Sequence, residues 1–278
     1  MWRAAHTCPG GQCQGVLRLT VSKGRKMILK KMFSLTWLFT TLLVFTGTAV
    51  LIRLGIWQLD RLEQRRAFNA QVESMRAAEL LDLNQNLPAD ISSMEWRTVT
   101  VIGEYDFENQ VALRNQYNGD QYGYHLITPL LFDPSTGSGQ AAVLVDRGWI
   151  PADGNAALER YAWRQYDEPG QVTVTGQIRL GQDKPAIGGV ADAEFTPEQM
   201  RLDVWNNLNV TRISKQSPYP LLSVYVQPNV GENNSEPPIK YQPVLELTEG
   251  SHFGYALQWF AFATILFIGY PFYLRKQE

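Results

Sequence analysis

The chain has 278 residues, of which 45% are hydrophobic and 19% are charged, and its formal net charge is −2. This length suits one domain of ordinary size together with anchoring segments. A near-neutral charge provides no basic stripe of the kind that binds nucleic acid, so we expect no nucleic-acid partner. The mean hydropathy of −0.22 is too polar for a protein that lies entirely within a membrane.

Two uncharged apolar segments lie toward the ends of the chain, over residues 33–52 and 255–274. Each contains about 20 residues, and a helix of that length spans about 30 Å, the thickness of a bilayer core. A buried core helix is one alternative, but soluble core helices normally carry a polar face. A cleaved signal peptide is another alternative for the first segment, but the apolar part of a signal peptide is usually only about 7–15 residues long. We therefore predict transmembrane helices at residues 32–54 and 254–274.

The charges beside the second segment indicate the orientation of the protein. Arg275 and Lys276 follow it, so the positive-inside rule places the C-terminus in the cytoplasm. Two spans return the N-terminus to the same side. We predict a multi-pass protein with cytoplasmic tails over residues 1–31 and 275–278 and an extracytoplasmic domain over residues 55–253. The membrane is then the inner membrane of a bacterial cell, with the domain in the periplasm, or alternatively the mitochondrial inner membrane.

Residues 1–26 differ from the rest of the chain because they contain no acidic residue and both of its cysteines, Cys8 and Cys13, with His6 nearby. A metal or redox site is one interpretation, but a closed zinc site usually needs four ligands. A mitochondrial presequence is another, although the apolar residues are sparse. We interpret the stretch as a disordered tail or as sequence upstream of the true start.

The domain begins with a helical pattern and continues with strands. Residues 56–81 lack Gly and Pro and have apolar residues at helical spacing. We also expect a short helix at residues 200–210. Period-two alternation bounded by turn residues predicts six strands, at residues 97–105, 111–115, 124–131, 142–150, 172–180 and 221–226. Strands without long alternating helices favour an antiparallel barrel or sandwich within an α+β, β-rich domain.

The domain carries none of the common catalytic motifs. It lacks G-x-S-x-G, the P-loop, G-x-G-x-x-G after a strand and H-E-x-x-H. Its two histidines, His125 and His252, are too few for a histidine-rich metal site. We therefore do not expect an enzyme.

His252 has the best physical case for a binding role. It lies just before the second apolar segment, where Tyr255 at i+3 and Trp259 at i+7 share its helix face. An imidazole beside aromatic rings at a membrane boundary suits an axial ligand of haem iron. The alternative is an interfacial histidine at the start of a helix.

The sequence Arg147-Gly148-Trp149 closes the predicted strand at residues 142–150. A strand end with a partly buried tryptophan is the simplest interpretation. We expect Arg147 and Trp149 to serve the fold or a docking surface and not bond-making chemistry.

Three motifs occur in a fixed order: LGIWQLDR at 54–61, VLVDRGWIP at 143–151 and HFGYALQWFAFA at 252–263. With the two apolar segments, this arrangement resembles the surfeit locus protein 1 family of cytochrome c oxidase assembly factors, over about residues 30–275. Phe253 departs from the family pattern, which usually has Leu there. The residues that match the family motifs are Trp57, Gln58, Arg61, Arg147, Gly148, Trp149, Pro151, His252, Tyr255, Ala256, Trp259 and Phe260.

The resemblance implies a factor that binds haem a and assists its insertion into the haem-bearing subunit of cytochrome c oxidase. It assigns His252 as the haem-iron ligand. From their places at the membrane boundary, we expect Tyr255 and Trp259 beside the cofactor and a cationic side chain such as Arg61 or Arg65 near its propionates. The implied partners are oxidase subunit I, other oxidase assembly factors and the lipid bilayer. The alternative is a membrane-anchored scaffold that stabilises an oxidase assembly intermediate without binding haem.

Overall fold

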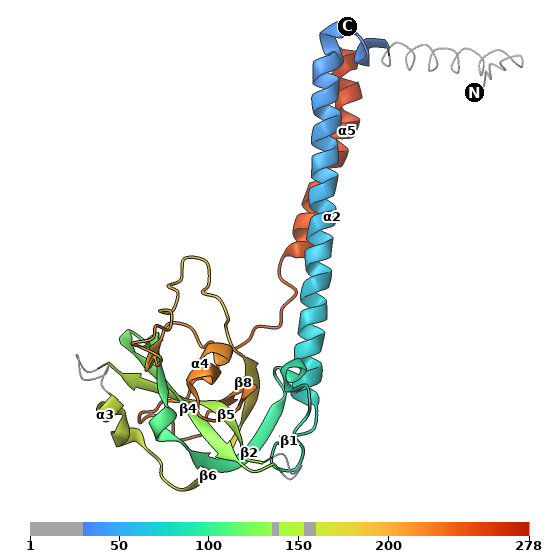
Figure 1. The fold of residues 1–278 in the computed structure, drawn as a ribbon. Coiled ribbons are helices and arrows are strands. Elements are labelled where there is room, and N and C mark those ends of the chain that lie inside the picture. Colours follow the sequence, from blue (N-terminus) through green and yellow to red (C-terminus); the bar gives the residue numbers. More distant parts are fainter. Residues whose placement is uncertain (1–29, 135–138, 153–159, 278) are drawn as a thin grey trace, which may run out of the picture. The chain divides into compact units, whose positions relative to one another are not determined.

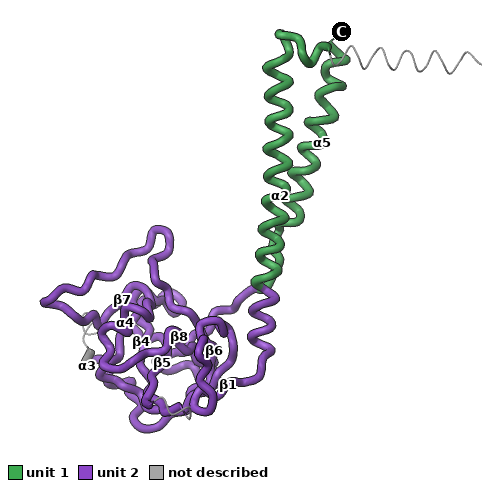
Figure 2. Tube along the Cα trace, turned by 45° about the vertical axis from the view of Figure 1, so that its right-hand side comes forward, with its two compact units in different colours: residues 1–68, 247–278 green, residues 69–246 purple. Residues whose placement is uncertain are grey.

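The computed structural model describes residues 30–134, 139–152 and 160–277, which divide into two compact units (Figure 2). The helical unit comprises residues 1–68 and 247–278, and the β unit comprises residues 69–246. The cysteines and nearly all of the predicted N-terminal tail lie outside the described residues.

Two long helices form the helical unit, α2 (Leu35–Ala77) and α5 (His252–Lys276), and they lie side by side (Figures 1 and 2). Both are long and apolar enough to cross a membrane, and only 11% and 17% of their most apolar windows are buried. A core helix of a soluble protein would be mostly buried, so this exposure supports the prediction of a membrane protein. The helix predicted to reach residue 81 ends at Ala77, and its last turns, from residue 69, belong to the β unit.

The two helices pack through small and aromatic residues. Gly55 is buried, and a Cβ at this position would lie 2.6 Å from the ring of Phe260. Farther along, the hydroxyl groups of Thr41 and Tyr270 are 2.6 Å apart and buried. Small residues let helices approach closely, and in an apolar environment each hydroxyl needs a partner. Because Gly55 has no side chain, the ring of Phe260 can lie against the backbone of α2 at this position.

The sheet of the β unit contains all six predicted strands, which are confirmed with small shifts at their ends. Two short strands, β1 and β7, add to them. Among the described residues, the strands are β1 (Leu81–Asp82), β2 (Thr98–Tyr105), β3 (Val111–Asn118), β4 (Gln121–Phe132), β5 (Ala141–Pro151), β6 (Gln171–Leu180), β7 (Val204–Trp205) and β8 (Leu221–Pro228). Short helices connect them, namely η1 (Ile91–Met94), η2 (Phe107–Asn109), α3 (Arg160–Trp163), η4 (Arg164–Tyr166) and α4 (Val210–Gln216).

The sheet closes into a barrel, which is one of the two predicted forms. Its strand order is β1-β2-β6-β8-β5-β4-β3-β7, and β2 also pairs with β4 through Glu104 and Leu131. The closed ring is therefore β2-β6-β8-β5-β4. Four of its pairings are antiparallel, but β5 and β8 are parallel, contrary to a purely antiparallel sheet. The reason is geometric, because strand directions cannot alternate all the way around a ring with an odd number of strands.

Alternating residues of these strands fill the barrel. Val99 and Val101 on β2 are fully buried, as are Val224 and Val226 on β8. A second cluster lies between β3, β4, β5 and α4, which buries β4 and β5 on both faces. This explains why these two strands read as nearly continuous apolar runs.

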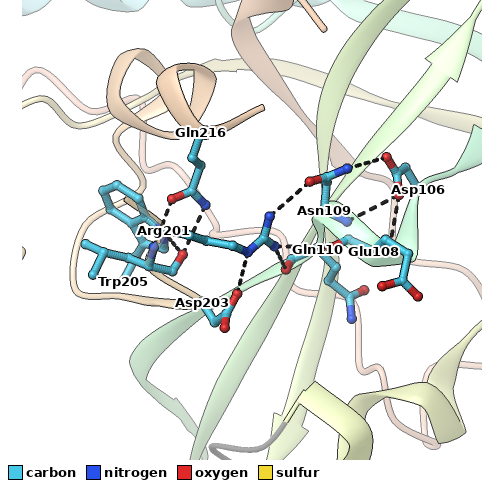
Figure 3. Close-up of polar contacts among 9 residues, drawn as sticks. Asp106, Glu108, Asn109, Gln110, Arg201, Asp203, Trp205 and Gln216 are labelled. Atoms are coloured by element: carbon cyan, nitrogen blue, oxygen red, sulfur yellow. Dashed lines mark hydrogen bonds and ion pairs between the residues drawn. The ribbon is translucent and has the colours of Figure 1, made fainter. Parts of the chain in front are cut away.

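The prediction of a short helix at residues 200–210 is wrong, because that stretch contains the two-residue strand β7 between bends and irregular chain, and α4 begins at Val210. The side chain of Asn209 caps α4 by accepting a hydrogen bond from the backbone N–H of Arg212 at 2.9 Å. Upstream, Arg201 clamps this stretch (Figure 3): it donates to Asp203 at 2.7 Å and to Asn109 at 2.9 Å. Tertiary hydrogen bonds therefore override the local helical preference there.

Candidate functional site

His252 is the first residue of α5. Gly250, two residues earlier, has a φ of +68°, a conformation that glycine adopts without strain. Ser251 occupies the N-cap position but makes no side-chain capping bond. The imidazole is half-buried. The turn at Gly250 thus sets where the helix starts and where the His252 side chain emerges.

One face of α2 lies against His252. Gln58, Arg61, Arg65 and Phe68 follow one another at intervals of three, four and three residues, so they share a helix face. The Nδ1 atom of His252 is 2.8 Å from the Oε1 atom of Gln58. A cavity of about 280 Å³ is lined by Arg61, Gln64, Arg65, Phe68 and His252.

The segment before α5 is tied to the same helix. Arg66 donates two hydrogen bonds to Glu249, at 2.8 and 2.9 Å, and Arg65 donates to the carbonyl oxygen of Thr248 at 3.1 Å. The hydrogen bond from Arg66 and its charge lower the pKa of Glu249, and Glu249 raises the pKa of Arg66 in return. Both groups are exposed, so the pair positions the chain more than it stabilises the fold.

The structure brings two of the four predicted cofactor-binding residues together. Arg61 and His252 line the same cavity, and Arg61 also lies 5.7 Å from the centre of the Trp57 ring. Tyr255 is 49% exposed and does not line that cavity, and neither does Trp259, which packs edge-to-face on Phe262.

Gln64 and Phe68 also line the cavity, and sequence reasoning did not find them. Their spacing relative to the motif residues Gln58 and Arg61 was the available signal. The cavity is lined by two guanidinium groups, one amide, one imidazole and one aromatic ring, with no carboxylate among the described residues. Such a lining suits a ligand that has an anionic group, which the guanidinium groups can bind, next to a metal ion, which the imidazole can bind.

The Arg147-Gly148-Trp149 motif lies in the β unit and is buried. A bulge in the β4–β5 pairing leaves Arg147 without a strand partner, because Leu126 pairs with Gly148 and Ile127 with Asp146. Arg147 donates hydrogen bonds to the side chains of Gln110 and Glu168 and to the carbonyl of Tyr166. It also stacks 5.1 Å from the ring centres of Tyr105 and Phe107. The hydrogen-bonding and stacking partners of the Arg147 side chain are thus residues of the β unit.

The next two motif residues connect β5 to residue 239. Gly148 has a φ of +122°, and a Cβ there would lie 2.5 Å from the carbonyl oxygen of Ile239. Trp149 exchanges two backbone hydrogen bonds with Ile239, both 2.8 Å long, and its side chain is 3% exposed. Pro151 ends β5. This motif therefore serves packing inside the β unit.

The other histidine of the domain, His125, is also internal. Its Nδ1 atom is 3.0 Å from Asp146, whose carboxylate also accepts a hydrogen bond from the backbone N–H of Gly148. Both side chains are buried. His125 is thus a paired core residue, whereas His252 lines an open cavity.

The SURF1 family matches residues 45–264, which is more than half of the chain and includes all three motifs. A SURF1-like protein of Rickettsia conorii (strain ATCC VR-613 / Malish 7) is 26% identical over 247 residues, covering 85% of this chain and 92% of that protein. A SURF1-like protein of Rickettsia bellii is 24% identical over 246 residues, covering 85% and 91%. The Surfeit locus protein 1 of Arabidopsis thaliana is 30% identical over 120 residues, covering 41% and 34%. The chain therefore belongs to the SURF1 family, and this membership supports a role in the assembly of cytochrome c oxidase.

Proposed function

We propose that this protein binds haem a and assists its insertion into subunit I of cytochrome c oxidase, from the inner membrane of a bacterial cell. The observation that carries the proposal is the cavity at the start of α5, where His252 lies with Arg61 and Arg65. The SURF1-like proteins of Rickettsia conorii and Rickettsia bellii each cover 85% of the chain and are bacterial, which supports the choice of membrane.

The residues of the cavity fit this cofactor. His252 offers an imidazole nitrogen to a metal, and among the described residues its Nε2 atom has no hydrogen-bond partner. Arg61 and Arg65 offer guanidinium groups, which bind carboxylates such as propionates bidentately. Phe68 offers an apolar surface to a macrocycle. When bound, haem a would supply the redox-active iron that the oxidase requires.

The size of the cavity suits a carrier. Sites that enclose a small ligand usually measure about 300–1,000 Å³, whereas this cavity is about 280 Å³ and open. The protein would thus hold one edge of a large macrocycle and leave the rest accessible to a recipient. A partly enclosed ligand is easier to hand over, because fewer contacts must break.

The test is the haem content of the full-length protein purified from cells that make haem a. We expect the wild type to show a Soret band and His252→Ala to lose most of it, because the variant lacks the nitrogen ligand. Ser251→Ala is the matched control, since the Ser251 side chain makes no capping bond, and it should retain the wild-type spectrum. Equal haem content and an unchanged spectrum in His252→Ala would exclude His252 as the ligand.

A scaffold that does not bind haem is the second candidate, and one observation favours it. An apolar groove of about 580 Å³ runs between α2 and α5 and suits the side chains of a partner's transmembrane helix. Ala49 and Ala263 line it, together with Phe45, Ile52 and Phe267. Wild-type protein that carries no haem but co-purifies with an oxidase subunit would support this second candidate.

A further inference from the structure

The Gln58 side chain is the only hydrogen-bonding partner of the His252 ring among the described residues, and the two residues are 194 positions apart in the sequence. A carbonyl oxygen can only accept a hydrogen bond. The contact of 2.8 Å between Nδ1 and Oε1 therefore requires the proton of the neutral imidazole to be on Nδ1. The lone pair is then on Nε2.

The surroundings keep that nitrogen accessible. Gly250 has no side chain, and a Cβ there would lie 3.5 Å from the Cδ2 atom of His252 and 3.8 Å from Nε2. The Arg66–Glu249 pair holds the segment that leads to Gly250 against α2. Ligating histidines usually donate their second ring N–H to a fixed acceptor, which sets the tautomer, the ring orientation and the basicity of the ligand.

We propose that Gln58 is the positioning residue of His252: its amide oxygen holds the Nδ1–H tautomer and orients the ring so that Nε2 is the haem-iron ligand. This inference rests on the proposed function for its ligand, but the tautomer itself is a property of the haem-free protein. Gln58 acts through His252 and does not touch the iron.

The first experiment needs no haem. The ring nitrogens of ¹⁵N-histidine-labelled full-length protein in detergent micelles are recorded by NMR at mildly alkaline pH. We expect an Nδ1–H signal for His252 in the wild type and in Gln58→Glu, which retains an oxygen acceptor. Gln58→Leu should shift His252 toward the Nε2–H tautomer that a free histidine side chain prefers.

Gln64→Leu is the matched control, because Gln64 lies on the same helix and lines the cavity beside His252 but bonds to Arg61. Its His252 signal should equal that of the wild type. An Nε2–H tautomer in the wild type, or an unchanged Nδ1–H tautomer in Gln58→Leu, would overturn the inference.

The second experiment is a titration of the same variants with ferric haem a. Gln58→Leu should weaken binding about 10- to 100-fold, as changes around metal-ligating histidines typically do, and should alter the electron paramagnetic resonance spectrum of the bound iron. Gln58→Glu should restore the affinity and lower the midpoint potential, because a carboxylate makes the imidazole a stronger donor.

Different results would contradict the proposed function and the positioning role of Gln58. If the wild type binds no haem, the proposed function fails, and the NMR result still decides whether Gln58 sets the tautomer. If His252→Ala loses haem but Gln58→Leu keeps the wild-type affinity and spectrum, the proposed function stands and the positioning role is rejected.

Discussion

At the scale of single residues, the motif at residues 147–149 illustrates how three neighbours serve three different physical needs. Arg147 brings a charge into the interior and is acceptable there only because Gln110, Glu168 and a backbone carbonyl accept its hydrogen bonds. Gly148 occupies a backbone position where a side chain would collide with Ile239.

Trp149 supplies apolar area, and we expect Trp149→Ala to destabilise the β unit strongly. Deleting a buried tryptophan side chain typically costs about 3–5 kcal/mol, and Trp149 is 3% exposed. The measurement is urea unfolding of the purified full-length protein, followed by far-UV circular dichroism. Ile187→Ala is the control, because Ile187 is fully exposed and should change stability by no more than about 0.5 kcal/mol. Equal stability of both variants, with oxidase assembly lost only in Trp149→Ala, would instead assign Trp149 to a docking surface.

At the scale of elements, Asp106 joins two parts of the β unit that are distant in sequence. It caps η2 by accepting hydrogen bonds from the backbone N–H groups of Glu108 and Asn109, and it accepts a bond from the hydroxyl of Tyr219 at 2.6 Å. Burial raises its pKa, but the hydrogen bonds from Asn109 and Tyr219 outweigh this and lower the pKa below the ordinary value of 3.8.

The lowered pKa predicts a pH-dependent effect of Asp106→Asn. A carboxyl group whose pKa is lower in the folded state stabilises that state above its unfolded pKa, and loses this contribution as pH falls through the folded value. The wild type should therefore be more stable than Asp106→Asn at neutral pH, and the difference should shrink below about pH 4.

Urea midpoints of the two proteins across that pH range measure the effect. Asn retains the oxygen that caps η2, but its NH2 group replaces Oδ2 and cannot accept the hydrogen bonds from Asn109 and Tyr219. The pH-dependent part of the difference therefore reports the carboxylate. Glu232→Gln, at an exposed position in the loop after β8, should show no comparable pH dependence. A constant difference between wild type and Asp106→Asn at all pH values would contradict the prediction.

At the scale of the whole molecule, two apolar helices with a basic tail after the second predict that the β unit is translocated and both termini are cytoplasmic. In a variant with Cys8 and Cys13 replaced by Ser, single cysteines at Asp120 and Gln277 test this, because both positions are exposed. A membrane-impermeant maleimide should label the cysteine at 120 in intact spheroplasts and the one at 277 only after permeabilisation. The reverse pattern would refute the orientation.

The sequence by itself determined the features that depend on near neighbours. Two uncharged runs predicted the long helices, period-two alternation predicted the six main strands, and three motifs indicated the family. His252 and Arg61 were also found in this way, because each lies beside an apolar span whose position is readable from composition.

Only the tertiary structure decided which distant residues meet. The closure of β2 onto β4, the parallel β5–β8 pair, the irregular chain at Arg201 and the contact of His252 with Gln58 all join segments far apart in sequence. Such pairings depend on how the whole chain packs, because a buried hydrogen-bonding group is satisfied by whichever partner the fold brings near it. The lining of a cavity also depends on how the helices pack. Tyr255 and Trp259 share a predicted helix face with His252 and yet do not line its cavity.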